Sequence, residues 1–210
     1  MSKRILVLAP HTDDGEFGCG GSIASFIEEG KEVHYVAFSL AEKADTEKMP
    51  DNILEMEIVK ETEQAIKVLG IQKLTMYKFQ VRKLDYARQE ILDTLVKIRK
   101  ETNPDLVFIP SPNDLHQDHR LVALEAIRVF KQITILAYEV PWNNIVFNTQ
   151  AFICLKKHHI EKKVKALKVY KSQSKRYFAK PDFIWHLAGV RRVQADTEYA
   201  EAFEVIRWMI

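Results

Sequence analysis

The chain has 210 residues, 47% hydrophobic and 29% charged, which is the composition of an ordinary soluble globular protein. Its net charge of +2 comes from 31 basic and 29 acidic residues spread along the chain, which excludes a strong field that would attract nucleic acid or anionic lipid. Cys19 and Cys154 are too few for a disulfide framework, and the apolar run Ile5–Leu8 is too short for a signal peptide or a membrane span. We therefore expect a cytoplasmic protein without stable membrane insertion.

Short β-rich runs alternate along the chain with longer segments whose apolar residues recur at helical spacing. The expected strands are Arg4–Ala9, Glu32–Ser39, Lys73–Tyr77, Asp105–Pro110 and Thr134–Glu139. Gly70 follows one of the intervening helices and Asn103-Pro104 follows another, as helix stop signals do. This alternation predicts an α/β fold with a Rossmann-like, doubly wound and mostly parallel sheet in three α/β/α layers.

After Pro141 the alternation of strand-like and helix-like segments is less regular. We expect a strand at Gln150–Leu155, a helix near His159–Tyr170, and an amphipathic or extended stretch over Tyr199–Arg207. No repeat or change of composition marks a boundary, so residues 1–210 are predicted to form a single domain. Within it, residues 1–140 form the Rossmann-like core, and residues 141–210, together with the Ala41–Asn52 loop, set substrate specificity.

Two clusters of histidine and aspartate follow two of the predicted strands. "PHTDDGE" (Pro10–Glu16) follows the first strand, and "PSPNDLHQDH" (Pro110–His119) follows the fourth. In the usual 3-2-1-4-5 order these two strands are neighbours, and open parallel sheets bind ligands beyond the carboxyl ends of the strands where the winding reverses. The two clusters are therefore predicted to converge in space.

The residue types in these clusters favour a metal site, although either cluster alone is also compatible with a polar turn or with a helix cap at Asp13 or Asp14. Histidine and aspartate suit a catalytic zinc held by two imidazoles and one carboxylate, with one position left for water. The convergent residues outnumber three ligands, and this surplus favours an enzyme over a closed structural zinc site. The polar residues in excess are Asp13, Glu16, His116 and Asp118, and the sequence pattern alone does not assign their roles.

Gly18–Gly21 ("GCGG") lie near the start of the next helix, where glycine lets a ligand approach the backbone. A dinucleotide-binding loop, however, needs glycines directly after the first strand. That turn holds His11-Thr12-Asp13-Asp14 instead, and its carboxylates would repel a pyrophosphate. The sequence therefore argues against dinucleotide binding.

At these residues the sequence resembles the PIG-L/LmbE family of zinc-dependent N-acetylglucosamine de-N-acetylases, through "HTDDGEFGCGG" and "PNDLHQDH". The resemblance implies that His11, Asp14 and His119 bind one zinc ion per chain, with iron as the alternative metal. It further implies that Asp13 is the general base, that His116 stabilises the oxyanion or protonates the departing amine, and that Asp118 holds the His116 ring in position. Thr12 replaces the proline usual in the family, and Gly15 stands where many members have Glu, which leaves the task of Glu16 open.

The expected function is metal-dependent hydrolysis that removes the N-acetyl group from a small-molecule N-acetylated amino sugar or its conjugate and releases acetate. Gly20, Gly21, Glu16 and Trp142 are the candidates for substrate contact, with Trp142 as a platform for a sugar ring. The alternatives are a metal-dependent hydrolase of another amide or of a phosphate ester, and a non-catalytic module that binds a sugar conjugate or a metal. A homo-oligomer is compatible with the sequence.

Overall fold

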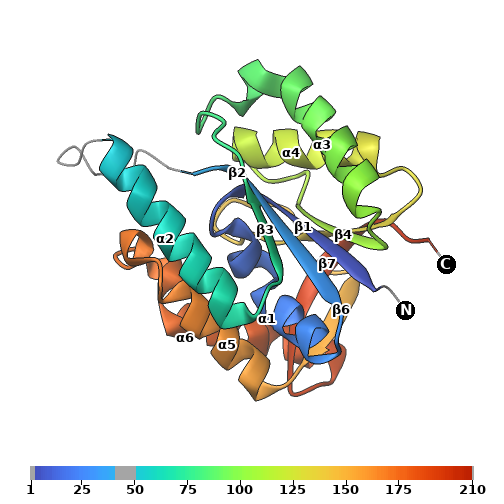
Figure 1. Cartoon of the computed structure of the whole chain (residues 1–210). Coiled ribbons are helices and arrows are strands. Elements are labelled where there is room, and N and C mark those ends of the chain that lie inside the picture. The colour runs from blue at the N-terminus through green and yellow to red at the C-terminus, as the bar shows by residue number, and fades with distance from the viewer. Residues whose placement is uncertain (1–2, 41–50, 210) are drawn as a thin grey trace.

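A seven-stranded sheet forms the centre of the protein in a computed structural model, which describes residues 3–40 and 51–209 (Figure 1). The part of the predicted specificity loop at residues 41–50 lies outside the described residues. The strands are β1 (Arg4–His11), β2 (Glu32–Ser39), β3 (Lys73–Met76), β4 (Leu106–Pro110), β5 (Thr134–Tyr138), β6 (Ala151–Leu155) and β7 (Tyr199–Arg207). Their order is β3-β2-β1-β4-β5-β7-β6, and the predicted order of the first five strands is confirmed.

Strands β1 to β5 are parallel to one another, whereas β7 runs antiparallel to both of its neighbours. The stretch Tyr199–Arg207 is therefore extended, and the mostly parallel α/β sheet that the sequence predicts is confirmed. Strands β6 and β7, which follow Pro141 in the chain, extend the same sheet beyond β5.

The helices cover both faces of the sheet, as Figure 1 shows. They are α1 (Asp14–Glu28), α2 (Asp51–Leu69), α3 (Arg88–Thr102), α4 (Gln117–Val129), α5 (Lys157–Leu167) and α6 (Pro181–Ala195). Helices α3 and α4 lie on one face, and α1, α2, α5 and α6 on the other. Gly70 and Asn103 follow α2 and α3 with left-handed backbones (φ of 87° and 40°), as their helix stop signals predict.

Alternate residues of the central strands enter two separate cores. On β1, Val7 packs with side chains of α1 and α2, while Leu6 and Leu8 pack with side chains of α3 and α4. All three are fully buried. A parallel sheet with both faces covered needs such continuous hydrophobic runs.

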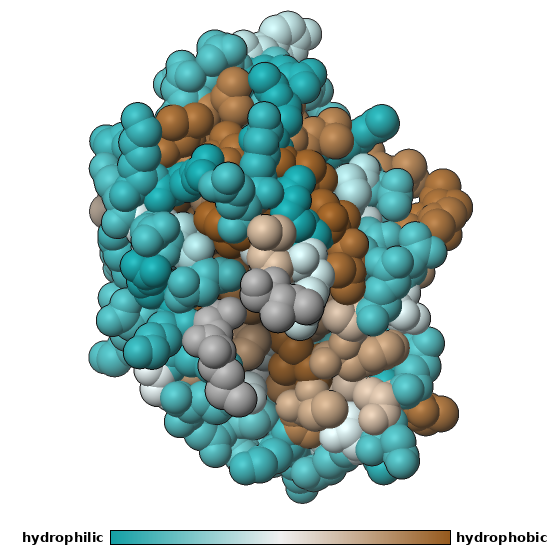
Figure 2. All heavy atoms as spheres, turned by 90° about the vertical axis from the view of Figure 1, so that its right-hand side faces the viewer, coloured by the Kyte–Doolittle hydropathy of each residue, from teal (hydrophilic) through white to brown (hydrophobic). Residues whose placement is uncertain are grey.

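Figure 2 shows the side of the molecule on which both termini lie, at the amino ends of the parallel strands. Hydrophilic side chains predominate along its left and lower margins, and hydrophobic ones form patches toward its centre and right. The carboxyl ends of the parallel strands, where the polar clusters are predicted to meet, lie at the opposite edge of the sheet. None of the helices in the described part of the chain combines the length and the apolarity that crossing a membrane requires.

Candidate active site

The two polar clusters meet at the carboxyl ends of β1 and β4. These strands pair directly and run parallel. His11 is the last residue of β1 and Asp14 the first of α1, while His119 lies in the first turn of α4. All three side chains are buried to more than nine-tenths, so the predicted convergence is confirmed.

Three donor atoms form a nearly equilateral triangle at this edge of the sheet. Asp14 Oδ2 lies 3.1 Å from His11 Nδ1 and 3.1 Å from His119 Nε2, and the two nitrogens are 3.2 Å apart. Donors bound tetrahedrally to zinc at 2.0–2.2 Å lie about 3.3 Å from each other. The triangle therefore fits one metal ion held by two imidazoles and one carboxylate.

A carboxylate stands behind each of the two histidines. Asp114 Oδ2 is 2.7 Å from His119 Nδ1, and Asp118 Oδ2 is 3.1 Å from His11 Nε2. An ionised carboxylate only accepts hydrogen bonds, so each ring donates one N–H outward and turns its other nitrogen toward the triangle, where that nitrogen can bind a metal once it carries no proton. This arrangement is typical of histidines that bind a metal.

The electrostatics of the triangle favour an ionised Asp14. Burial by itself would raise the pKa of Asp14, but the charges and hydrogen bonds of His119 and His11 outweigh burial and hold this pKa below its usual range. Burial would lower the pKa of His119, but Asp14 and Asp114 raise it to about 9. Without an ion, His119 therefore carries a proton that a metal must displace.

Asp118 contacts two of the histidines, His11 and His116, and it does so through different groups. Its backbone N–H donates to His116 Nδ1 (3.2 Å), while its carboxylate accepts from His11 and from the backbone amides of Arg82 (2.6 Å) and Leu84 (3.3 Å). The expected contact of Asp118 with the His116 ring is therefore made through the main-chain N–H of Asp118. The carboxylate of Asp118 faces the ring of His11.

His116 is the N-cap residue of α4 and is half-buried beside the triangle. Its ring centroid lies 4.8 Å from that of His11 and 4.7 Å from that of His119. Burial, followed by the charges of those two rings, lowers the pKa of His116. Because Nδ1 accepts a hydrogen bond, the neutral ring carries its proton on Nε2 and can donate it to a ligand.

Asp13 occupies the N-cap position of α1, next to Asp14, and is half-buried. Its side chain makes no capping hydrogen bond to the helix, although the sequence made it a candidate for that role. The site thus combines a triangle of donors with a neighbouring carboxylate and a neighbouring imidazole.

Residues 6–130, which hold both clusters, match the sequence model of the family described as PIG-L: GlcNAc-PI de-N-acetylase. The chain belongs to the PIG-L family. It is 29% identical to the "Uncharacterized deacetylase YaiS" of Escherichia coli K12 over 81% of this chain and 91% of that protein. It is 28% identical to the diacetylchitobiose deacetylase of Thermococcus kodakarensis over 60% of this chain, which corresponds to about half (49%) of that protein.

Solved structures show the same fold. The N,N'-diacetylchitobiose deacetylase of Pyrococcus horikoshii, solved with its inhibitor MPG, superimposes with a TM-score of 0.83 at 25% identity, over 98% of this chain and 84% of that chain. GalB of Pseudomonas putida KT2440, a 4-carboxy-2-hydroxymuconate hydratase, also gives a TM-score of 0.83, at 20% identity over 99% of this chain and 98% of that chain. Because a hydratase shares the fold, the fold by itself does not decide the reaction of a chain of this shape.

Glu16 is fully buried in this PIG-L family protein, which corrects its expected contact with substrate. The hydroxyls of Tyr35 and Tyr170 donate to its two carboxylate oxygens, and both hydroxyls also lie 3.0 Å from the carbonyl oxygen of Thr12. Burial raises the pKa of Glu16 to about 8, despite the opposing effect of the tyrosine hydrogen bonds. Glu16 is therefore linked to the His11–Asp14 turn through the hydroxyls of these two tyrosines.

Gly20 and Gly21 are buried as well, and their expected role beside the substrate is corrected. A Cβ atom on Gly20 would lie 3.0 Å from Lys163 Cγ, and one on Gly21 would lie 2.7 Å from Leu155 Cδ1 and 3.1 Å from Glu201 Oε1. These glycines make room for other parts of the protein, because α1 packs closely against α5, β6 and β7.

Trp142 remains a candidate for substrate contact. It is 37% exposed, and its ring stacks on Phe178 (3.8 Å between centroids) and meets the edge of Phe17 (5.2 Å). Phe17 lies one helical turn beyond Asp13, and the residue after Trp142, Asn143, accepts a hydrogen bond from Leu115 N (3.2 Å). The aromatic wall formed by Phe17, Trp142 and Phe178 thus adjoins both loops of the site.

Sequence reasoning missed three residues of the site. Asp114 lies within the quoted "PNDLHQDH", but its five-residue separation from His119 matches no helical face and carries no signal. Tyr170 and Arg82 reach the site from distant segments, and the left-handed backbone of Arg82 (φ 62°) has no glycine to reveal it.

A second group with metal-ligating side chains lies at the far end of α1, where Glu28 meets His158 and His159. Both Nε2 atoms lie at hydrogen-bond distance from Glu28 Oε2 (2.6 and 2.5 Å), closer together than ligands around a metal. His159 Nδ1 also accepts from the backbone N–H of Lys156 (3.1 Å), which leaves the His159 proton on Nε2. The group is therefore a hydrogen-bonded contact between α1 and α5.

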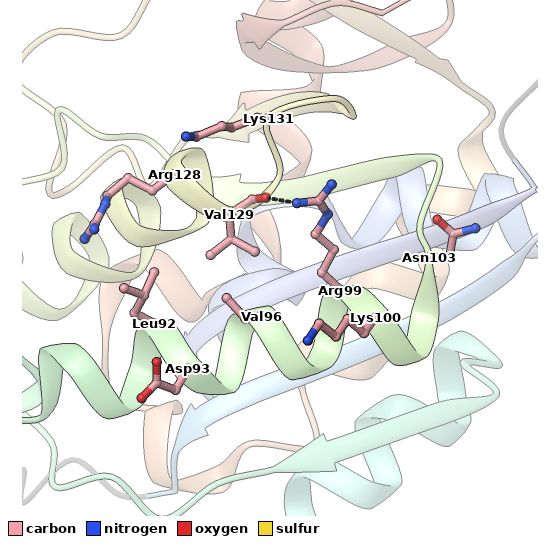
Figure 3. Close-up of a pocket in the computed structure, with 9 residues that line it drawn as sticks. All are labelled: Leu92, Asp93, Val96, Arg99, Lys100, Asn103, Arg128, Val129 and Lys131. Atoms are coloured by element: carbon pink, nitrogen blue, oxygen red, sulfur yellow. Dashed lines mark hydrogen bonds between the residues drawn. The ribbon is translucent and has the colours of Figure 1, made fainter.

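A pocket with a volume of about 800 Å³ lies between α3 and the C-terminal end of α4, and Figure 3 shows the residues that line it. Two of its basic side chains face acceptors of the protein: Arg99 donates to the carbonyl of Val129 (2.9 Å), and Arg128 pairs with Glu125. His116 and His119 lie at the opposite, N-terminal end of α4, so this pocket is separate from the donor triangle.

Proposed function

We propose that this PIG-L family protein is a metal-dependent N-deacetylase that hydrolyses the acetamide of a small N-acetylated amino sugar or its conjugate to acetate and a free amine. The observation that carries the proposal is the donor triangle of His11, Asp14 and His119, with edges of 3.1–3.2 Å and a carboxylate behind each imidazole. Zinc is the proposed ion, one per chain, and iron is the alternative. When bound, such an ion supplies a Lewis acid that polarises the acetyl carbonyl and acidifies a water.

Asp13 is the proposed general base. Its carboxylate accepts a proton from the attacking water as the oxygen of that water forms a bond to the acetyl carbon. The proton then passes to the nitrogen as the C–N bond breaks, so that the amine leaves neutral. The support for this assignment is that Asp13, the N-cap residue of α1, directly precedes Asp14, which belongs to the donor triangle.

His116 is the proposed donor to the oxyanion or to the departing nitrogen. The Asp118 N–H engages its Nδ1, which directs the Nε2–H elsewhere. The lowered pKa of His116 keeps the ring neutral near pH 7, so it acts as a hydrogen-bond donor without needing to gain a charge. His11, Asp14 and His119 hold the ion in this proposal, and Asp114 and Asp118 orient the two ligand histidines.

The relatives support this reaction class more than the alternatives. YaiS is named a deacetylase, and the Thermococcus and Pyrococcus relatives are named for diacetylchitobiose, an N-acetylated sugar. Residues 3–40 and 51–209 contain one such donor triangle, and a phosphoesterase often needs two bridged metals. Trp142 stacks on Phe178 and is 37% exposed, and it is the residue that we assign to substrate contact, through the C–H face of a sugar ring.

The test is an acetate-release screen over N-acetylated sugars, with the protein first stripped of metal and then supplied with zinc. The proposal predicts release from at least one sugar by the wild type, and loss of both the bound zinc and the activity in His119→Ala. A control variant, Glu28→Gln, removes the carboxylate of the second histidine group and is expected to retain both. Absence of acetate from the whole panel, with zinc bound, would revive the non-catalytic binding module.

A further inference from the structure

Helix α1 is interrupted one turn beyond the metal triangle. Cys19 has non-helical backbone angles (φ −143°, ψ 23°), which divide α1 into a short first segment that begins at Asp14 and a longer second segment that ends at Glu28. In an unbroken helix, the N–H of residue i donates to the carbonyl of residue i−4. The break therefore affects the carbonyl groups before Cys19 and the amide groups after it.

Lys163 and Glu201 fill this break with their charged groups. Lys163 Nζ donates to the carbonyl of Phe17 (2.6 Å), while the carboxylate of Glu201 accepts from the backbone amides of Gly21 (3.0 Å) and Ser22 (2.7 Å). The ammonium and the carboxylate are themselves 2.6 Å apart. The pair thus caps the end of the first segment and the start of the second, and joins them.

The pair is buried, with side chains of Lys163 and Glu201 only 4% and 7% exposed. Removing two charges from water is costly, and apolar replacements of buried ion pairs are often equally stable. A contribution to stability therefore does not by itself explain why a buried ion pair occurs at this position. The two glycines described above are what admit it, since a Cβ on Gly20 would press on Lys163 and one on Gly21 on Glu201.

The first segment of α1 carries much of the proposed chemistry. Asp13 caps it by position, Asp14 supplies the carboxylate of the donor triangle, and Phe17 lies in the aromatic wall. The direction of this segment decides whether Asp14 Oδ2 meets the two histidine nitrogens. Misplacing a catalytic group by about 1 Å can cost about 100-fold in rate.

We propose that Lys163 and Glu201 are positioning residues, which set the direction of the first segment of α1 and thereby the placement of Asp13 and Asp14. The proposal rests on the proposed function for its kinetic consequences. Neither residue touches the reacting atoms. Lys163 acts through the carbonyl of Phe17, and Glu201 acts through the amides of Gly21 and Ser22.

The test compares Lys163→Met and Glu201→Gln with the control Glu125→Gln, which removes the charge of another buried carboxylate that pairs with Arg88 and Arg128. With metal and substrate saturating, we expect kcat to fall about 10- to 100-fold in the two test variants while KM changes little. The visible absorption spectrum of the cobalt-substituted protein should change in the test variants, because Asp14 shifts as a ligand. In the metal-free protein, the amides of residues 14–18 should exchange hydrogen faster than in the control.

A second variant covers the case in which a single substitution leaves one buried charge and prevents folding. Lys163→Met/Glu201→Gln removes both charges and is expected to fold, yet to show the same loss of kcat and the same spectral change. Wild-type kcat, cobalt spectrum and hydrogen exchange in the double variant would overturn the positioning role. If the wild type releases no acetate from any substrate, the proposed function fails, while the spectrum and the exchange rates still decide the positioning role.

Discussion

Asp114 is the residue whose importance is clearest from geometry and least visible in the sequence. It accepts from His119 Nδ1 at 2.7 Å and from the backbone N–H of His116 at 2.8 Å, and it is 2% exposed. Such a partner fixes both the tautomer and the orientation of a ligand histidine. Asp114 therefore belongs to the proposed metal site as the partner of one of its histidines.

We predict that Asp114→Asn weakens zinc binding by about 10- to 100-fold, because an amide holds the His119 ring less firmly than a carboxylate. Competition with a chelator of known affinity measures the effect. Asp105→Asn serves as the control, since Asp105 pairs with Arg4 at the other end of the sheet. Equal zinc affinity of Asp114→Asn and wild type would remove Asp114 from the site.

The raised pKa of Glu16 predicts how the stability of the protein depends on pH. Its pKa is about 8 in the folded protein against 4.5 as the ordinary value, so the folded state holds a proton that the unfolded state has lost between these two pH values. The free energy of unfolding of the metal-free protein should therefore fall as pH rises from about 4.5 to about 8, by at most about 1.4 kcal/mol per pH unit from this group. Below pH 4.5 this contribution of Glu16 to the free energy of unfolding does not change with pH. Above pH 8 the contribution is lost in full and again does not change with pH.

Urea unfolding of the metal-free wild type and of Glu16→Gln at pH 5 and pH 8 measures this effect. The glutamine has no proton to lose, so the difference in stability between the two proteins should shift in favour of the variant at the higher pH. Parallel pH dependences would show that Glu16 is ionised throughout and that the tyrosine hydrogen bonds outweigh its burial.

The donor types and their spacing predict the site from the sequence in part. His11, Asp14 and His119 meet where strand order places them, because the topology of parallel sheets brings those two loops together. The residues that surround these three side chains could not be predicted in the same way. Tyr170 reaches Glu16 across 154 positions of the chain, and Asp118 turns its carboxylate to His11 across 107, and no local pattern encodes such contacts.

At the scale of elements, the glycines of α1 each leave space for a different neighbouring side chain. A Cβ on Gly18 would lie 2.2 Å from Cδ2 of the buried Tyr138, whereas one on Gly189 in α6 would meet nothing within 4 Å. The sequence run "GCGG" indicates close approach but not what approaches. The approaching groups prove to be Tyr138, Lys163, Leu155 and Glu201, all from later elements of the chain.

We predict opposite effects of alanine at these two helical positions. Gly18→Ala should lower the free energy of unfolding by about 1–3 kcal/mol, because the core must shift to admit the methyl group. Gly189→Ala should raise it by up to about 1 kcal/mol, because alanine favours a helix interior over glycine. Thermal and urea unfolding of both variants provide the comparison. A stabilised Gly18→Ala would mean that Tyr138 can move away at little cost.

The secondary structure was predictable where periodicity was strong. Strands β1 to β5 begin and end within two residues of their predicted ranges, since each is a run of β-rich residues between turn signals. Tyr199–Arg207 was ambiguous because alternation alone does not reveal a partner strand. Its pairing with β5 and β6 is tertiary, and so is its direction.

At the scale of the whole molecule, one continuous sheet joins the section that carries the proposed metal ligands to the section after Pro141. Glu204 on β7 accepts from Ser111 (2.5 Å) and from the backbone N–H of Asn148 (3.1 Å), which ties the loop after β4 to the last strand. Glu201 on the same strand reaches the break in α1. The later part of the chain therefore supports the placement of the catalytic loops in addition to any contact with substrate.

The central claim is that one bound metal and Asp13 together carry out amide hydrolysis at the His11–Asp14–His119 triangle. The most direct measurement titrates zinc into metal-free wild type and Asp13→Asn, and follows bound zinc and acetate release on the best substrate of the screen. The account predicts that wild-type activity rises to a plateau at one equivalent, and that Asp13→Asn binds the same equivalent with activity reduced by orders of magnitude. Activity that survives without metal, or that persists in zinc-loaded Asp13→Asn, would contradict it.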